Sequence, residues 1–331
     1  MKTFTNAAPR DLKAAVAAAS QARSNGQRVS FAGGGSDILG QMKDRVVSPD
    51  VLVYLKSVKG LDTVTSDAKA TTIGGLITLD ALAHHDAIRT RFAALAMAAE
   101  TEATPQIRNA ATLAGNICQR PWCWYYRNGF ACLKNGGNRC FSVDGENQFH
   151  AIFGGGPSYI VHPSDTAPAL VALEASFRIT GPSGERTVPA SEFFVLPKDN
   201  AARENVLHDD EVLSAIVLPQ TPARQRSTYF KVMDREAWTH AIVSAAVAMT
   251  MDSGGVCREA RIVLGGVAPI PWRVPEVEKL LKDQRITREL AARAGAAAVQ
   301  GARPLAKNAY KVPMTEAMVA RAIRSLAGAN A

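Results

Sequence analysis

The chain has 331 residues, of which 47% are apolar and 21% charged, and its net charge is +8. This length predicts two or three domains with buried cores, and the composition is typical of a soluble globular protein. We expect no membrane span and no signal peptide, since the sequence has neither a long apolar run nor a leader pattern. We also expect no nucleic-acid partner, because no cluster of Lys/Arg residues or known motif accompanies the charge.

The first hundred residues predict helices and short strands. Residues 9–24 place apolar side chains on one helical face. Short apolar strands are expected at 28–31, 51–55 and 70–77, and the alanine-rich stretch 78–100 is expected to be helical.

The middle of the chain differs, because residues 117–160 show no periodicity and contain several Asn-Gly and Gly-Gly turn signals. A loop of this length in a compact domain is usually functional or disordered. After it, a helix is expected at 166–173 and a hairpin at 176–188. The turn-rich stretch 219–226 predicts a domain boundary.

The C-terminal part predicts a second domain over 222–331. Strands are expected at 229–232, 242–251 and 260–265, and three helices from about residue 275 onward.

Four of the five cysteines, Cys118, Cys123, Cys132 and Cys140, fall within the central loop. Four thiolates suit a [4Fe–4S] cluster. Zinc is the main rival, although its usual paired CxxC spacing is absent, and unrelated thiols or disulfides remain further alternatives. The stretch between the outer cysteines contains four cations and no acid, and positive charge would stabilise a reduced cluster. These cations are Arg120, Arg127, Lys134 and Arg139.

Two other segments indicate a ligand with phosphates and a flat ring. Gly33-Gly34-Gly35 follows a predicted strand, and consecutive glycines can form a backbone nest for an anion, although a bare glycine run can also be a flexible turn. The glycines do not form the GxGxxG motif of dinucleotide folds. In residues 104–116, small side chains at Ala110, Ala111, Ala114 and Gly115 would let a planar ligand approach the backbone.

These two segments carry a family resemblance. GGGSDIL (33–39) and IRNAATLAGN (107–116) resemble the two loops that hold FAD in the FAD-binding subunits of the molybdenum hydroxylases, the xanthine dehydrogenase and aldehyde oxidoreductase family. Four further segments match the family in the same order: 162–175, 229–249, 264–273 and 308–312.

The resemblance implies an α+β fold. The FAD-binding domain, of the vanillyl-alcohol-oxidase (PCMH) type, would span 1–221, with subdomains at about 1–58 and 59–221 and an iron–sulfur loop at 117–160. A C-terminal α+β domain of the CO dehydrogenase flavoprotein type would span 222–331.

The resemblance also implies the residues of the site. Lys231 is expected near the isoalloxazine, where a cation favours the anionic reduced flavin, with an ordinary surface lysine as the alternative. The implied FAD contacts are Ala32, Gly33, Gly34, Gly35, Ser36, Asp37, Thr104, Ile107, Arg108, Asn109, Thr112, Ala114, Gly115, Asn116, Ser164, Asp165 and Lys231.

One branch of the family, which includes periplasmic aldehyde oxidoreductases, carries an extra [4Fe–4S] cluster at this place. Cys123, Cys132 and Cys140 match that branch, but its fourth cysteine is replaced here by Ser158. We expect Cys118 to complete the cluster. Ligation by Ser158, a [3Fe–4S] centre and the absence of a cluster are the alternatives.

The sequence therefore predicts the FAD-binding subunit of a heterotrimeric molybdenum hydroxylase. Its implied partners are a molybdopterin-binding large subunit, a [2Fe–2S] small subunit and an external electron acceptor. A stand-alone FAD oxidoreductase and a zinc-stabilised interaction module are the alternatives. We expect the cytoplasm, or the periplasm if a partner carries a Tat signal.

Overall fold

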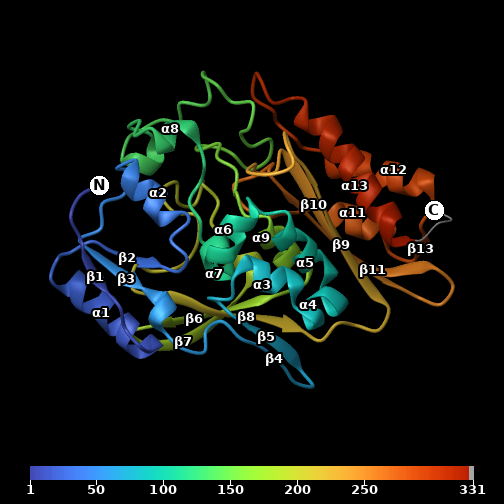
Figure 1. Cartoon of the computed structure of the whole chain (residues 1–331). Helices are drawn as coiled ribbons and strands as arrows, with labels where there is room; N and C mark the ends of the chain where they lie inside the picture. The colour runs from blue at the N-terminus through green and yellow to red at the C-terminus, as the bar shows by residue number, and fades with distance from the viewer. Residues whose placement is uncertain (328–331) are drawn as a thin grey trace.

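The computed structural model describes residues 1–327, and three β-sheets organise this part of the chain (Figure 1). The first sheet is parallel, with strand order β1-β3-β2. Helix α1 packs against it through buried alanine and valine side chains. The bounds in this region are β1 Thr5–Ala7, α1 Leu12–Ser24, β2 Val29–Ala32, α2 Ile38–Lys43, β3 Val51–Tyr54 and the 3₁₀ turn Leu55–Ser57.

The predicted helix at 9–24 is confirmed from Leu12 onward. It begins there because the Asp11 side chain accepts a hydrogen bond from the Ala14 backbone N–H at 2.7 Å. An aspartate N-cap of this kind satisfies a donor that the first helical turn leaves unpaired.

The second sheet is antiparallel, with order β4-β5-β8-β6-β7. Several short helices cover one of its faces (Figure 1). The strands are β4 Val64–Ser66, β5 Ala70–Gly74, β6 Ser176–Gly181, β7 Gly184–Pro189 and β8 Val212–Pro219. The helices of this region are α3 Leu79–His84, α4 Asp86–Arg91, α5 Ala93–Glu100, α6 Pro105–Ala110, α7 Leu113–Ile117, α9 Thr166–Ala172 and α10 Ala190–Phe193.

The helical stretch expected at 78–100 is divided into three helices. The backbone leaves the helical conformation at His85 and Phe92. These two breaks turn Leu82, Ile88 and Leu95 toward one core, in which each is 0% exposed.

The third sheet forms the core of the C-terminal part. Helix α13 packs against β9 and β10 and helix α11 against β11, while α5 and α9 from the N-terminal part also contact this sheet. Its strands run in the order β12-β11-β10-β9, with β13 beside β11. The bounds are β9 Gln225–Val232, β10 Val243–Met251, β11 Val256–Gly265, β12 Trp272–Arg273, α11 Pro275–Leu281, β13 Gln284–Arg285, α12 Arg288–Ala298 and α13 Lys311–Ala327.

The central loop is ordered, with one short helix, α8 Trp124–Arg127, and a 3₁₀ turn at Leu133–Asn135. Aromatic side chains hold it together: the rings of Tyr125 and Phe130 each lie against Phe141, with centroids 6.0 Å and 5.2 Å away. Within residues 1–327, no helix is both long enough and apolar enough to cross a membrane.

Candidate FAD site and cysteine loop

The glycine loop and the α6–α7 loop press against each other. A Cβ on Gly34 would lie 1.8 Å from the Ala110 carbonyl oxygen, and one on Gly33 would lie 2.6 Å from Thr112 Oγ1. Such distances are far below any contact that a real Cβ makes, so only glycine permits this approach. The two segments expected to share a ligand therefore form one continuous surface.

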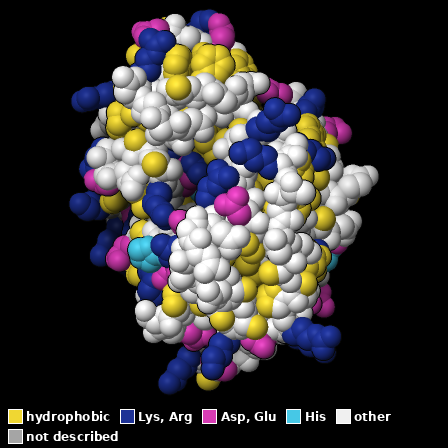
Figure 2. All heavy atoms as spheres, turned by 90° about the vertical axis from the view of Figure 1, so that its left-hand side faces the viewer, with side chains coloured by type: hydrophobic (Ala, Val, Ile, Leu, Met, Phe, Trp, Pro, Cys, Tyr) yellow, Lys and Arg dark blue, Asp and Glu magenta, His cyan; other side chains and the backbone are white. Residues whose placement is uncertain are grey.

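This surface lines a cavity of about 570 Å³, which is within the usual range of about 300–1,000 Å³ for ligand pockets. Apolar residues of the first sheet and residues of the segment 202–213 also line the cavity. Figure 2 shows the side of the molecule that carries the N-terminal part of the chain, with Lys and Arg side chains gathered near its middle. The predicted FAD contacts in this lining are Gly33, Gly34, Gly35, Ser36, Asp37, Thr112, Ala114 and Gly115.

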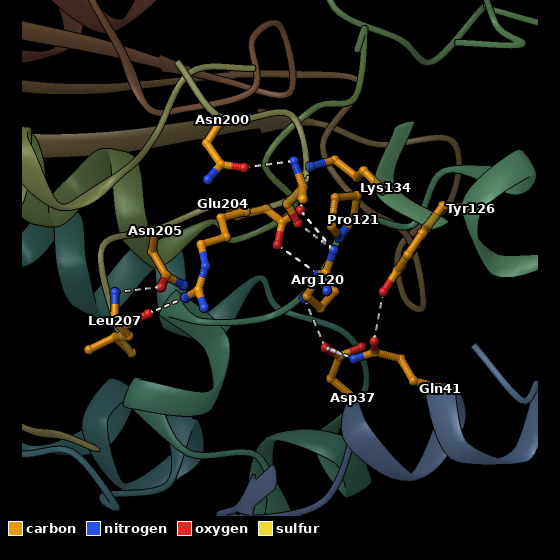
Figure 3. A network of polar contacts seen from close by, with 12 residues as sticks. Asp37, Gln41, Arg120, Pro121, Tyr126, Lys134, Asn200, Glu204, Asn205 and Leu207 are labelled. Carbon is orange, nitrogen blue, oxygen red and sulfur yellow. Dashed lines mark hydrogen bonds and ion pairs between the residues drawn. The ribbon is translucent and has the colours of Figure 1, made fainter. Parts of the chain in front are cut away.

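An ion-pair network ties the central loop to the wall of this cavity (Figure 3). The two Asp37 carboxylate oxygens accept from Arg127 Nη2 at 2.7 Å and from the Arg120 backbone N–H at 2.9 Å. Glu204 pairs with both Arg120 and Lys134, at 2.7 Å and 2.5 Å. The Lys134 and Glu204 side chains are 1% and 5% exposed.

This network changes the role expected for the loop cations. Arg120, Arg127 and Lys134 are paired with acids from distant parts of the sequence rather than left as unbalanced charge around the cysteines. Arg139 instead stacks over the Phe141 ring at 4.2 Å. The cations therefore serve chiefly to fix the loop against the glycine-loop cavity.

A second, buried polar network includes Ser164 and Asp165. Asn116 Oδ1 accepts from the Ser164 hydroxyl at 2.6 Å, and Asn116 Nδ2 donates to Glu102 Oε1 at 2.6 Å. The same Glu102 oxygen accepts from the Asp165 backbone N–H at 2.8 Å. Burial, followed by the neighbouring Asp165 charge, raises the pKa of Glu102 to about 7.

Lys231 lies within this network. Its Nζ is 2.5 Å from Asp165 Oδ2 and also donates to the carbonyl oxygens of Thr101 and Thr239, at 3.0 Å each. Its side chain is 1% exposed, which excludes the surface-lysine alternative. Because all three ammonium protons have protein acceptors, Lys231 holds the Asp165 side chain in place.

Three further predicted FAD contacts, at or within helix α6, shape the α6–α7 loop: Thr104, Arg108 and Asn109. The Thr104 hydroxyl accepts from the Ile107 N–H at 3.3 Å and caps the helix. Arg108 donates to the Glu102 carbonyl oxygen at 2.8 Å, and Asn109 donates to that of Pro105 at 2.9 Å. Ala32 is buried at the end of β2.

A second cavity, of about 230 Å³, lies among the central loop, residues 160–165 and residues 234–242. Ser164 and Asp165 line it, and so do Cys123 and His150. At this cavity the Trp122 and His240 rings are 5.5 Å apart. Sequence reasoning missed His150 and Glu102 because neither stands in a recognisable motif.

The structure places Cys118 at the glycine-loop cavity and Cys123 at the second cavity. Cys118 packs against the core of the N-terminal part and lines the glycine-loop cavity, where burial raises its pKa to about 12. The pKa of Cys123 is raised to about 11 by burial and then by the nearby thiols of Cys140 and Cys132. Among residues 1–327, no three His, Cys, Asp or Glu side chains converge closely enough to hold a single metal ion.

Comparison with known protein families accounts for almost the whole chain. Residues 2–221 match the model of the FAD binding domain in molybdopterin dehydrogenase, and residues 228–326 match that of the CO dehydrogenase flavoprotein C-terminal domain. The chain belongs to the family of FAD-binding subunits of molybdenum hydroxylases. The predicted fold class is thereby confirmed, as is the prediction of an FAD-binding oxidoreductase subunit.

Individual relatives agree. The FAD-binding subunit PaoB of an aldehyde oxidoreductase from Escherichia coli is 32% identical, covering 91% of this chain and 93% of that protein. The carbon monoxide dehydrogenase medium chain of Hydrogenophaga pseudoflava is 27% identical and covers 97% of this chain and 96% of its own. A solved carbon monoxide dehydrogenase from that organism superposes with a TM-score of 0.77 at 26% identity, covering 98% of this chain and 97% of the solved chain.

Proposed function

We propose that this chain works in a heterotrimer, where it receives electrons from [2Fe–2S] centres of a small subunit and passes them to an external acceptor. A molybdopterin-binding large subunit would oxidise the organic substrate. The family match and the medium-chain relatives support this arrangement. When bound, FAD supplies the chemistry that accepts and releases electrons, while the protein positions it and tunes its potential.

The observation that carries this proposal is the convergence of the two loops on one cavity. The Gly33–Gly35 backbone can come close to a pyrophosphate because glycine adds no Cβ, and positive φ at Gly35 (+78°) belongs to the same turn. Asp37 is held by Arg127 and the Arg120 backbone, which anchors this wall to the central loop. The buried Lys231–Asp165 pair holds Asp165 at the wall of the second cavity.

We also propose a [4Fe–4S] cluster in the central loop, bound by Cys123, Cys132 and Cys140. A single metal ion needs its ligands around one point, whereas a cluster offers four iron atoms and accepts more widely spaced ligands. The bridge between Cys132 and Arg139, the residue before Cys140, brings two of these cysteines together and supports this assignment.

Purification of the chain together with its partners tests the function. FAD equimolar with this chain, molybdenum in the complex and iron exceeding that of the small subunit are expected. Assays of the complex with aldehydes, purines and N-heteroaromatic compounds would identify the substrate class. A colourless chain, or an FAD-bearing chain that turns over substrate without partners, would contradict the proposal.

We propose that the complex works in the cytoplasm, with co-export to the periplasm as the alternative. Fractionation of cells that produce the whole complex distinguishes the two compartments.

A further inference from the structure

We infer that the second cavity admits the external electron acceptor, and that this acceptor is a small, neutral, flat molecule of the quinone class. This inference rests on the proposed function and adds to it the place and the chemistry of the acceptor. The cavity lies among the central loop, residues 160–165 and residues 234–242, whereas the glycine loop lines the other cavity.

The second cavity leads from solvent toward predicted FAD contacts. Trp122, Trp124 and Trp238 line it and are 41%, 43% and 55% exposed, so they lie at its entrance. Ser164 and Asp165 also line it, but they are only 3% and 1% exposed and so belong to its inner wall. A molecule that enters past the tryptophans therefore approaches residues that are expected to contact FAD.

Trp238 is held at this entrance in a strained backbone conformation. Its φ is +58°, in the left-handed region that a bulky side chain rarely adopts. Its N–H donates to the Ala103 carbonyl oxygen at 3.1 Å, and its own carbonyl oxygen accepts from Arg235 Nη2 at 2.7 Å. Strain that the surroundings hold in place is concentrated at ligand sites. We therefore assign the exposed indole of Trp238 as a stacking surface for the acceptor.

The shape of the cavity favours a flat molecule of one or two fused rings. Its aromatic walls include Trp124 beside Phe149, with ring centroids 5.9 Å apart, and Trp122 beside His240, at 5.5 Å. Aromatic faces of this kind bind conjugated rings by stacking. The volume of about 230 Å³ lies below the usual range of about 300–1,000 Å³ for ligand pockets, which disfavours a whole dinucleotide.

The charges around the cavity favour a neutral molecule. Glu146, Asp165 and Asp234 line it, whereas no Lys or Arg of residues 1–327 does. Glu146 and Asp165 are paired with lysines, but no cation within these residues pairs with Asp234. Three cations contact lining residues from outside the cavity and are already engaged by protein acceptors: Arg127, Lys231 and Lys311. An acceptor with phosphates would therefore meet repulsion without a compensating cation.

The electron balance is complete with the groups named. A fully reduced flavin releases two electrons and two protons, and a quinone takes up both to become a hydroquinone. The flavin returns to its oxidised form without any further reactant. Both forms of the acceptor are neutral, which suits a cavity lined by acids and aromatic rings.

Reoxidation of the flavin in the full complex tests the place of binding. The flavin is reduced with dithionite, the excess is removed, and reoxidation by naphthoquinone is followed in a stopped-flow instrument. We expect the rate to saturate with quinone concentration. Trp238→Asn should raise the half-saturating concentration about tenfold, because asparagine tolerates the left-handed backbone but offers no ring. Trp238→Phe should restore most of the loss.

A second comparison tests the charge argument. Naphthoquinone sulfonate carries a negative charge on the same ring system, so it should half-saturate at a higher concentration than naphthoquinone. Asp234→Asn should narrow this difference, because it removes an acid from the lining. Tyr54→Ala is the control, since it removes a half-exposed aromatic ring that does not line the second cavity and should change neither value.

The outcomes separate the inference from the proposal beneath it. A complex without FAD refutes the proposed function itself. Reoxidation that does not saturate, a Trp238→Asn variant that matches wild type, or a preference for NAD⁺ or the sulfonate overturns the inference alone. Release of a subunit from the Trp238→Asn complex also overturns it, since the entrance would then be a contact surface for a partner. FAD content and Tm serve as folding controls for each variant.

Discussion

Gly34 lies where the two halves of the FAD site touch, and the contact requires the absence of a side chain. A Cβ there would lie 1.8 Å from the Ala110 carbonyl oxygen. Neither the glycine loop nor the α6–α7 loop could move away from the other without deforming the cavity. The glycine run read from the sequence as a phosphate-binding nest therefore has a second role, which is to let one loop pack on the other.

Gly34→Ala should lower FAD retention strongly and destabilise the fold by about 1–3 kcal/mol, the usual cost of overpacking. Gly40→Ala is the matched control, because a Cβ at Gly40 in helix α2 would meet nothing within 4 Å. That control should keep its FAD and gain about 0.5–1 kcal/mol from the better helix former. Flavin absorbance per chain and thermal unfolding measure both effects; equal FAD content in the two variants would contradict the expectation.

Glu102 should make stability depend on pH. Its pKa is raised by burial from 4.5 to about 7, so the folded state keeps a proton that the unfolded state has lost. Stability is therefore full below about pH 4.5 and falls as pH rises toward 7, by about 3 kcal/mol or less.

Glu102→Gln should remove this dependence. The amide can keep both hydrogen bonds, because Asn116 and the Asp165 N–H donate to the same Glu102 oxygen. Urea unfolding from pH 4.5 to 7.5, at saturating FAD, should show wild type losing stability relative to the variant. If the free energies of unfolding of wild type and variant changed in parallel with pH, a proton on Glu102 would be ruled out.

At this scale the sequence singles out the glycine loop, Ser164 and Asp165 as site residues, because local motifs specify them. It does not predict Glu102 or the partners of Lys231, since those contacts join residues that are far apart in the chain. The choice of Cys118 as cluster ligand followed from proximity in sequence, and the structure places Cys118 and Cys123 at different cavities.

At the scale of elements, the central loop is fastened by charge. Lys134 and Arg120 hold Glu204, while Arg127 holds Asp37 in the glycine loop. Regular elements with a clear apolar period, such as α1 and the hairpin of β6 and β7, were predictable from sequence. The helix breaks at His85 and Phe92 were not predictable from the sequence, because they arise from the packing of three short helices into one core.

Glu204→Gln should loosen the central loop. It leaves the Lys134 ammonium buried without its counter-charge, which typically costs about 3–5 kcal/mol. Hydrogen exchange in residues 118–150 should accelerate. Glu146→Gln is the control, since Glu146 also pairs with a lysine, Lys307, but both side chains are about half exposed and their pair contributes at most about 1 kcal/mol. Similar hydrogen exchange in the two variants would contradict an anchoring role of the buried Lys134–Glu204 pair.

At the scale of the whole molecule, residues 303–311 of the C-terminal part close on residues 146–152 of the central loop. Six hydrogen bonds from Arg303, Lys307, Asn308, Tyr310 and Lys311 reach the segment 147–152. Asn308 alone donates to two carbonyl oxygens, those of His150 and Ala151, and is 0% exposed.

Asn308→Ala should therefore weaken the proposed cluster site, whose segment around His150 lies 158 positions earlier in the chain. Leaving a buried carbonyl oxygen unpaired costs about 1–3 kcal/mol, and this variant leaves two. Exchange in residues 146–152 should rise and cluster iron should fall, while FAD content is kept. Asn128→Ala, which removes an exposed amide that donates to the Trp124 carbonyl oxygen, should change neither. An Asn308→Ala variant that loses FAD while it keeps its iron would contradict this expectation.

The closing contact of residues 303–311 also sets an order of events during synthesis. Chains fold from the N-terminus as they leave the ribosome, so the glycine-loop cavity can form while the rest is still being made. The segment around His150 is fastened only when residues 303–311 emerge. We therefore expect flavin to be able to enter an incomplete chain, whereas the proposed cluster would be secured only by a nearly finished one, and stalled chains should accumulate as yellow, iron-poor protein.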